Sequence, residues 1–406
     1  MSSWGVIDDD TIAEARALIG TPLRRDRMQW VQTATPDAIR QFCEGIADDN
    51  PLWLDADYAA ASNHGRLLAP PSFLYALDAT IVAPKLAGVQ WIYAGTVFRW
   101  YDVIAAHQRF DTTAVLLDME EKTGRRFGRW VLQTGEVSYR TTDGALVATA
   151  QGKIARTPRV RKSDEAQAEA SEPVSQSEKD AAQPDEGGAI YTPSQLAAIR
   201  AEAAAHQRLG SEPRLWETVS AGDRVGPLIR GPLTLDDIFR WYVGAQGALH
   251  YGGAHGDAVR YRRRHDDYEI NTKTGAKDSA ARGHFTAREG RTAGMGGAYD
   301  VGPHRISWLG TLLSDWGGDD SFLTAMTVDV LRPNLVEDTT WWSGRVRDTW
   351  QRDGNSFVTI DVRAQNQDEV VHARGTAVVA LASESLGPVQ LPLTDIGNDW
   401  LQKPTR

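Results

Sequence analysis

A repeated three-residue sequence, Asp-Thr-Thr, constrains the fold more than any other feature of this chain. It occurs at residues 111–113 and again at residues 338–340. After each copy, apolar and polar residues alternate through a stretch of strand length, turn at Gly124 or Gly354, alternate again and reach a second polar turn. Alternation with period two, interrupted by glycine and polar turns, is typical of an antiparallel meander. The chain is therefore expected to contain two copies of one sheet.

Each expected sheet is preceded by two stretches with helical character. The outer pair, "TPDAIRQFCEGIADDNP" and "TLDDIFRWYVGAQGALH", share a threonine in the N-cap position and acidic residues in the first turn. The inner pair, residues 69–82 and 304–316, are mostly apolar, as a helix wrapped by a sheet should be. We predict an α+β fold in which each of two antiparallel sheets curls around one central helix.

The boundary between the two arms is marked by a change in composition. Residues 159–190 are rich in Ala, Ser, Glu, Asp, Gln and Pro and nearly free of large apolar side chains, so they cannot bury enough surface to offset their ordering entropy. We predict a flexible acidic linker between an N-terminal arm, residues 1–158, and a C-terminal arm, residues 191–406. A solvated helix is the alternative for its Ala/Glu-rich first half.

Composition narrows the possible partners and the compartment. The 406 residues carry a net charge of −10, which disfavours nucleic acid and anionic membranes as partners. No stretch approaches 18 apolar residues, so no membrane span is expected. The single cysteine allows no intramolecular disulfide and no cysteine zinc cluster. With no signal peptide visible at the start, we predict a cytoplasmic protein, with a homodimer possible through exposed sheet edges.

The stretch "FCEGIADDNPLWLDADYAAASNHGRLLAPPSFLYAL" resembles the MaoC-like dehydratase/hydratase family of hotdog-fold proteins. The second arm follows the same order of elements at lower similarity, and "YDVGPHRISWLG" is similar to a divergent double-hotdog branch of acyl dehydratases. The resemblance implies a double hotdog that adds water to, or removes it from, the double bond of an enoyl thioester. It also implies coenzyme A as the carrier of the acyl substrate, with no metal and no cofactor.

Such a reaction needs a base to activate water at the β-carbon and an acid to protonate the α-carbon. The thioester oxygen gains charge, so backbone N–H groups at a helix start should face it. The family supplies an aspartate and a histidine five residues apart, with an asparagine between them. Asp48 and Asn50 fill two of these positions, but Trp53 occupies the histidine position and is expected to pack there. Asp48 could equally serve as a turn-forming carboxylate.

In the second arm, the same seven-residue frame falls on "GAQGALH", residues 244–250. It puts His250 in the histidine position, with Ala245 and Gly247 in the aspartate and asparagine positions. Neither arm therefore holds an intact pair, and His250 needs another partner. Asp300 and His304 are the preferred candidates because they adjoin the start of the second central helix, although His304 could be purely structural.

A long insertion, residues 251–300, lies between His250 and that helix and concentrates arginine in an otherwise acidic chain. Arginine suits the phosphates of a CoA-type ligand, while a solvated charged loop is the alternative. No tight HxH or HExxH spacing indicates a metal site. The residues expected to bind substrate are Asn50, Arg260, Arg288, Tyr299 and Gly302.

We therefore predict a hydratase or dehydratase that works in the second arm, with catalytic candidates His250, Asp48, Asp300 and His304. A non-catalytic acyl-CoA-binding or assembly subunit stays open, because both acid/base pairs are incomplete. A hotdog thioesterase also stays open, although Asp78 and Asp315, the acidic residues on the central helices, come late in them.

Overall fold

The computed structural model describes residues 5–25, 29–124, 127–158, 188–246, 255–256, 259–260, 274–276 and 280–401. Most of the expected linker, residues 159–187, lies outside these ranges. So do His250 and much of the insertion that follows it.

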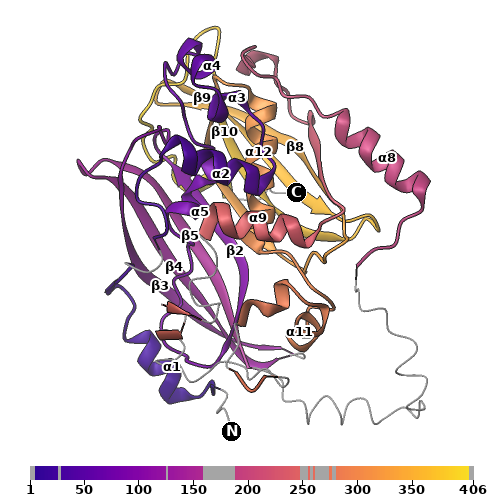
Figure 1. The fold of residues 1–406 in the computed structure, drawn as a ribbon. Coiled ribbons are helices and arrows are strands. Elements are labelled where there is room, and N and C mark those ends of the chain that lie inside the picture. The colour runs from indigo at the N-terminus through magenta and orange to yellow at the C-terminus, as the bar shows by residue number, and fades with distance from the viewer. Residues whose placement is uncertain are drawn as a thin grey trace.

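The described strands form one ten-stranded antiparallel sheet in the order β1-β3-β4-β5-β2-β7-β10-β9-β8-β6 (Figure 1). In the first half they are β1 (Pro22–Leu23), β2 (Gln90–Trp100), β3 (Phe110–Gly124), β4 (Gly128–Thr141) and β5 (Leu146–Thr157). In the second half they are β6 (Arg224–Arg230), β7 (Phe322–Val330), β8 (Thr340–Arg352), β9 (Asn355–Gln365) and β10 (Val371–Leu381).

The second half of the sheet repeats the first. Reading inward from either edge, a short strand is followed by the three strands of the meander and then by the strand that follows the central helix. The two Asp-Thr-Thr sequences lie at matching places, within β3 and at the start of β8. Strands β2 and β7 join the halves through pairs that run from Gly95–Asp329 to Arg99–Ala325. The prediction of an antiparallel double hotdog is confirmed, with the two expected sheets joined into one through β2 and β7.

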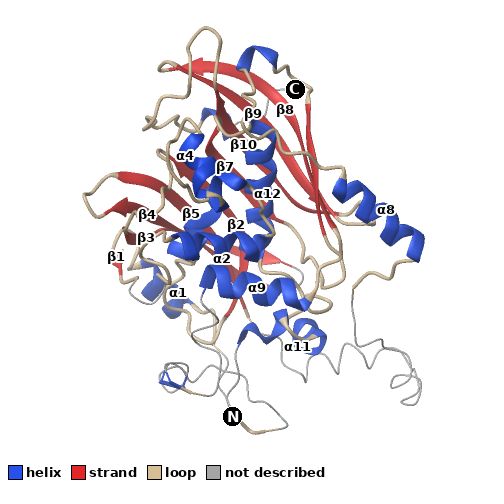
Figure 2. Ribbon diagram, turned by 45° about the horizontal axis from the view of Figure 1, so that its top comes forward, coloured by secondary structure: helices blue, strands red, loops and turns tan. Residues whose placement is uncertain are grey.

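The larger helices lie together on one face of this curved sheet (Figure 2). They are α2 (Pro36–Ile46), α9 (Leu235–Gln246) and α12 (Gly302–Gly317), with shorter pieces at α3 (Pro51–Leu54), α4 (Ala56–Ala61), η1 (Pro71–Phe73) and α5 (Leu74–Leu77). Outside this layer are α1 (Asp9–Arg16), α8 (Pro193–Ala204), α11 (Ala287–Thr292) and the 3₁₀ turns η2 (Trp216–Thr218), η3 (Ala280–His284) and η4 (Asp399–Leu401).

Helices α2 and α9 cross each other at two glycines related by the internal repeat. A Cβ on Gly45 would lie 2.9 Å from the Arg240 carbonyl oxygen, and a Cβ on Gly244 would lie 2.5 Å from that of Gln41. Only glycine therefore permits this close crossing. The crossing places the two arms back to back, so that one hydrophobic core runs through both.

The two central helices differ in length. Helix α12 runs over Gly302–Gly317 and is buried along most of its length, which confirms the prediction for residues 304–316. The prediction of a helix over residues 69–82 is wrong beyond Leu77, since only η1 and α5 are helical. The chain becomes extended at Asp78, whose carboxylate accepts hydrogen bonds from Arg25 and from the Thr80 N–H. This buried ion pair and local turn end the helix.

After Asp78 the chain lies directly on the first half of the sheet instead of continuing as a helix. A Cβ on Gly135 would be 2.2 Å from the Val82 Cβ, and a Cβ on Gly152 would be 2.0 Å from the Thr80 carbonyl oxygen. These glycines are paired across β4 and β5. Two facing glycines thus leave the sheet bare enough for an extended segment to pack against it.

Candidate active site

The Asp-x-Asn-Pro stretch of the first arm forms a tight polar turn between α2 and α3. Asp48 accepts a hydrogen bond from the Asn50 N–H at 3.1 Å, and Asn50 accepts one from the Leu52 N–H at 3.0 Å. The second carboxylate oxygen of Asp48 accepts a hydrogen bond from the Thr311 hydroxyl of α12 at 2.9 Å. Burial and the nearby Asp315 raise the pKa of Asp48 above its ordinary value. Asp48 thus has the turn-forming contacts that a structural carboxylate would have.

This turn and the helix after it are fastened to the second arm by polar contacts. Arg230 donates to the Ala47 carbonyl oxygen at 2.8 Å, and Arg208 bridges Asp49 and Asp315. Asp319, just beyond α12, accepts a hydrogen bond from the Tyr58 hydroxyl at 2.6 Å. The first arm's motif therefore works as part of the interface between the arms.

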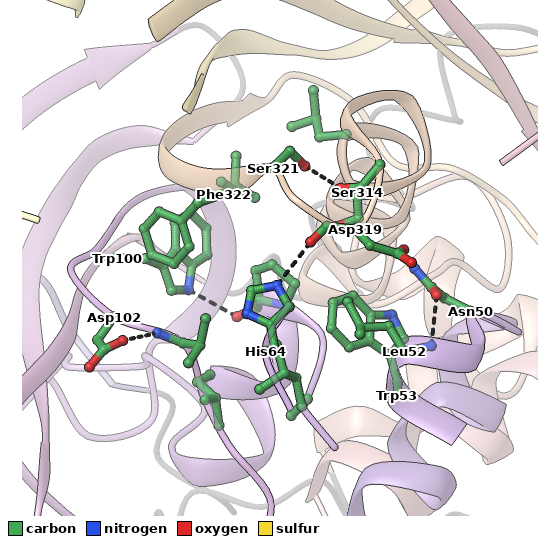
Figure 3. Close-up of a pocket in the computed structure, with 18 residues that line it drawn as sticks. Asn50, Leu52, Trp53, His64, Trp100, Asp102, Ser314, Asp319, Ser321 and Phe322 are labelled. Atoms are coloured by element: carbon green, nitrogen blue, oxygen red, sulfur yellow. Dashed lines mark hydrogen bonds between the residues drawn. The ribbon is translucent and has the colours of Figure 1, made fainter. Parts of the chain in front are cut away.

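Trp53 occupies the histidine position and is 6% exposed. Its ring lines a small cavity of about 50 Å³ together with Asn50, His64 and Phe322 (Figure 3). The cavity walls are otherwise largely apolar, and the nitrogen Nε2 of His64 is bound to the Asp319 carbonyl oxygen at 2.9 Å. The expectation that Trp53 packs where an acid/base histidine would stand agrees with this geometry.

The two central helices begin at equivalent points but offer different backbone groups. The isolated bridges Leu68–Ala105 and Tyr299–Leu335 precede the two helix starts and make Pro71 and Gly302 the equivalent first residues. Gly302 carries one of the N–H groups that an α-helix leaves without an internal acceptor, and no side chain caps this helix start. Pro71 has no N–H. Only the second arm can therefore present a backbone donor at this position.

Asp300 lies beside the start of α12 but is held in a buried ion pair. Arg305 donates to one carboxylate oxygen from Nε at 2.7 Å and to the other from Nη2 at 2.5 Å. Both side chains are 1% exposed. Arg305 also donates to Nδ1 of His372 at 2.8 Å. A carboxylate whose oxygens are both committed in this way anchors the helix start, which does not favour its use as a catalytic acid or base.

His304 is buried in an aromatic cluster between the arms. Its ring stacks on Trp241 at a centroid distance of 5.2 Å and contacts Trp308 at 4.5 Å. In the first arm, Phe73 packs on Phe42 at the equivalent place, but edge-to-face, at a centroid distance of 5.4 Å. Burial lowers the pKa of His304 to about 4. His304 thus has the surroundings of its apolar counterpart Phe73, which favours a structural role.

The helix crossing corrects the frame in which His250 was placed. Thr35 and Thr234 precede α2 and α9 at equivalent positions, and Gly45 and Gly244 meet at their crossing. The same alignment sets His250 opposite Pro51. The seven-residue frame drawn from the sequence was therefore displaced by two residues, because it was anchored on the loop rather than on the helices. His250 itself lies outside the described residues.

The described part of the insertion packs near the start of α12. The His284 ring lies 4.3 Å from that of Tyr299, and His284 Nδ1 is 2.9 Å from the Tyr299 carbonyl oxygen. Burial lowers the pKa of His284. Arg288 and Arg260 are exposed. Tyr299 and Asp300 thus lie at the helix start, while these two arginines lie at the surface.

The ring of Tyr93, from the first arm, also packs at this helix start, and its hydroxyl joins a group of hydroxyls that the sequence did not reveal. The Tyr93 hydroxyl lies 2.7 Å from the Thr80 hydroxyl and 3.3 Å from that of Tyr75. A Cβ on Gly302 would lie 3.3 Å from Cδ1 of Tyr93. Tyr93 comes from β2 and Thr80 from the extended segment after α5. Their approach depends on the early end of that helix, which no local sequence signal revealed.

Among the described residues, His, Cys, Asp and Glu side chains form no group of three that could hold a metal ion. No helix in the described part of the chain is both long and apolar enough to cross a bilayer.

Comparison with known proteins agrees with the geometry. Residues 18–150 match the family described as FAS1-like, dehydratase domain region. UPF0336 proteins from Streptomyces griseus and Saccharopolyspora erythraea are 26% and 28% identical over 125 and 126 residues. Each match covers 29% of this chain, and 80% and 77% of the relatives.

Solved structures extend the likeness to both arms. A MaoC-like dehydratase matches 91% of this chain and 100% of its own, with a TM-score of 0.59 and 14% identity. A putative MaoC domain protein dehydratase from Chloroflexus aurantiacus matches 91% and 93%, with a TM-score of 0.51 and 12% identity. Fold and helix placement define a double-hotdog protein. Residues 18–150 are thus similar to a dehydratase domain region, and the chain as a whole shares the fold of solved MaoC-like dehydratases.

Proposed function

We propose that this protein adds water to, or removes it from, the double bond of an enoyl-CoA thioester, at a site that includes the start of α12. The observation that carries the proposal is the difference between Gly302 and Pro71. A half-buried, uncapped helix start, whose first N–H has no acceptor within the helix, suits an oxygen that gains negative charge. The corresponding start in the first arm lacks that donor.

The reaction needs a base near the β-carbon, a hydrogen-bond donor at the thioester oxygen and an acid near the α-carbon. During hydration, a base removes a proton from water while the water oxygen bonds to the β-carbon. The electron pair of the double bond moves toward the thioester oxygen, which the Gly302 N–H would stabilise. An acid then delivers a proton to the α-carbon. The alignment of α9 with α2 takes His250 out of the motif's histidine position, but we still propose it for the proton transfers. The committed contacts of Asp300 and the aromatic packing of His304 make these two residues poorer candidates.

The shortened helix of the first arm supports a place for the acyl group. Because α5 ends at Leu77, the hydroxyls of Tyr75 and Thr80 meet that of Tyr93, whose ring lies beside Gly302. We propose that the acyl group extends from the thioester toward the first arm past the Tyr93 ring. Tyr93→Leu should then alter the preference among acyl groups without abolishing binding of CoA itself.

A second function, binding of an acyl thioester without turnover, is favoured by the state of the first arm. Trp53 replaces the histidine, and Asp48 is committed to the Asn50 N–H and Thr311. Neither group is then placed to catalyse a reaction. The first arm would serve as a structural or binding half in either case.

The test is incubation of the full chain with a panel of enoyl-CoA thioesters, with products identified by mass. Addition of water supports the hydratase, release of free CoA indicates a thioesterase, and binding without change of mass indicates the binding protein. His250→Ala should lower the hydration rate about 10²-fold or more, the usual effect of losing a general acid or base. His64→Ala, in the first arm's cavity, serves as the matched control and should keep the rate.

A further inference from the structure

A second candidate site lies on the opposite face of the sheet from the central helices. Trp342 points inward, since its indole nitrogen donates to the Arg305 carbonyl oxygen of α12 at 3.0 Å. Side chains alternate along a strand, so Trp341, Ser343 and Arg345 point outward. Together with residues of β6 and β9 they line a groove of about 620 Å³. This volume lies within the usual range for small-molecule sites.

The groove gathers arginines that lack counter-charges. Arg224 of β6 is directly opposite Arg345 of β8, and like charges in facing positions are destabilising. Arg363 lies one strand further in, on β9. Neither Arg224 nor Arg363 has a hydrogen bond or ion pair with any residue of the described ranges. Arg345 donates one hydrogen bond, to the Gly222 carbonyl oxygen.

The one acidic side chain lining the groove does not neutralise these arginines. Asp361 faces Arg345 across β8 and β9, but its carboxylate oxygens accept hydrogen bonds from Nε and Nη2 of Arg347. Three exposed guanidinium groups thus converge in a chain of net charge −10. Repulsion among these arginines lowers the stability of the free protein. A bound anion would offset this repulsion, which explains why the arginines are gathered here.

An aromatic ring completes the groove. Trp341 is half-buried, and its indole nitrogen donates to the Glu202 carboxylate of α8 at 3.0 Å. Figure 1 shows α8 beside the edge of the sheet near β8. This hydrogen bond fixes the ring at the rim, and fixed aromatic faces stack well with flat heterocycles.

We propose that this groove, defined by Arg224, Arg345, Arg363 and Trp341, binds a nucleoside phosphate. The arginines take the phosphate groups and the indole stacks on the base. The site is separate from the thioester site at Gly302, because the sheet lies between them. The ligand is either a free nucleotide or the nucleotide portion of coenzyme A, which share this chemistry.

Titration calorimetry of the full chain with ADP, adenosine and inorganic tripolyphosphate tests the proposal. ADP should bind saturably, and adenosine should bind at least about tenfold more weakly, since charge-assisted hydrogen bonds to phosphate are lost. Arg345→Gln and Arg363→Gln should each weaken ADP binding about tenfold or more. Trp341→Leu should weaken binding of ADP but not of tripolyphosphate.

The matched control is Arg140→Gln. Arg140 is another exposed strand arginine that donates one hydrogen bond to a turn carbonyl oxygen, that of Gly144, and its loss should leave ADP binding unchanged. Melting curves of every variant establish that the chain is folded. Absence of saturable binding at millimolar ADP, or equal affinity in wild type and the groove variants, overturns the proposal.

Coenzyme A distinguishes the two sources of the ligand. If Arg345→Gln and Arg363→Gln weaken CoA binding as they weaken ADP binding, the nucleotide portion of CoA occupies the groove. If CoA binding is unchanged while ADP binding falls, the ligand is a free nucleotide. Both results keep the nucleotide site, and neither depends on whether the chain hydrates an enoyl thioester.

Discussion

At Trp53, one residue differs from the acid/base motif while the backbone turn of the motif is kept. Asp48 and Asn50 still form the turn that places a side chain at position 53. The side chain there is a buried indole packed in the core of the molecule, which cannot exchange a proton at neutral pH. The turn keeps its geometry although no histidine stands at position 53. It has a second, structural role, because Asp48 accepts a hydrogen bond from Thr311 of the other arm.

We expect Asp48→Ala to lower the free energy of unfolding by about 1–3 kcal/mol, because it leaves the Thr311 hydroxyl and the Asn50 N–H without their buried acceptor. Chemical denaturation measures the change. Combined with Thr311→Val in a double-mutant cycle, the pair should show a coupling energy of about 0.5 kcal/mol or more. Enoyl-CoA hydration, if present, should persist in the folded variant. A folded Asp48→Ala protein that has lost all turnover would instead place the working site in the first arm.

His304 should make the protein sensitive to acid. Its pKa is about 4 in the folded chain against an ordinary value of 6.5, so the unfolded chain binds the proton more tightly. The stability that this residue contributes is therefore complete above pH 6.5 and falls as the pH drops toward 4. The loss is on the order of 3 kcal/mol. Burial is the main cause of the lowered pKa of His304, and Arg230 lowers it further. Asp300 and the Gly45 carbonyl oxygen act in the opposite direction and raise the pKa.

The variant His304→Phe tests this, since Phe73 occupies the equivalent position in the first arm. Urea unfolding at pH 7 and pH 4.5 should show a smaller loss of stability for the variant than for the wild type, by about 2–3 kcal/mol. Equal losses in the two proteins would mean that His304 is not the acid-sensitive group.

At the scale of elements, the start of α12 matters more than its length. Gly302→Pro removes the N–H while keeping a helix start that Pro71 already shows to be compatible with this fold. The preceding Val301 is extended, with φ −90° and ψ 123°, as a residue before proline must be. We expect the kcat for hydration to fall about 10²-fold or more, the usual loss for an oxyanion donor.

Gly302→Ala is the control for this substitution. It keeps the N–H and adds only a Cβ that would lie 3.3 Å from the Tyr93 ring, so it should retain most of the activity. Equal losses in the two variants would show that crowding against Tyr93, rather than the missing donor, lowers the rate.

The elements also show how far the sequence alone could predict this molecule. The strands of the two meanders followed from period-two alternation and the Asp-Thr-Thr repeat, and α12 followed from a mostly apolar stretch, because these patterns are local properties. The order in which the strands join into one sheet came only from the structure. The early end of the first central helix did not, because it depends on Arg25 meeting Asp78 from 53 positions away and on glycines of two other strands. The ion pair of Asp300 with Arg305 and the stacking of His304 were missed for the same reason. Which side chains meet depends on the tertiary structure and not on the local sequence.

At the scale of the whole molecule, the two arms share one sheet and one core. Strands β2 and β7 pair along their central residues, and α2 crosses α9 without intervening side chains at the two glycines. Each arm alone would expose a sheet edge and an apolar helix face, a combination that favours aggregation. We therefore expect the two arms to fold as one unit that includes the interface between them.

This leads to a prediction for the chain divided within the linker. Residues 1–158 and 188–406, produced together as two polypeptides, should copurify as a stable pair, while either piece alone should aggregate. Size-exclusion chromatography with light scattering gives the outcome, and the intact chain is the reference. A first arm that is monomeric and fully folded by itself would show that the β2–β7 joint adds little to its stability.

The facing glycines of β4 and β5 also bear on how such a chain can evolve. If residues 78–82 alone were changed to favour a longer helix, the space above Gly135 and Gly152 would lose its occupant, and an unfilled core cavity costs about 24 cal/mol for each Å³. If either glycine alone gained a side chain, it would collide with Val82 or Thr80. A longer helix without the new side chains leaves a cavity, and a new side chain without the longer helix causes a collision, so neither change can come first. The shortened helix is thus a nearly irreversible step, and descendants of this chain are expected to vary what lies beside Tyr93 rather than to regain the missing turns.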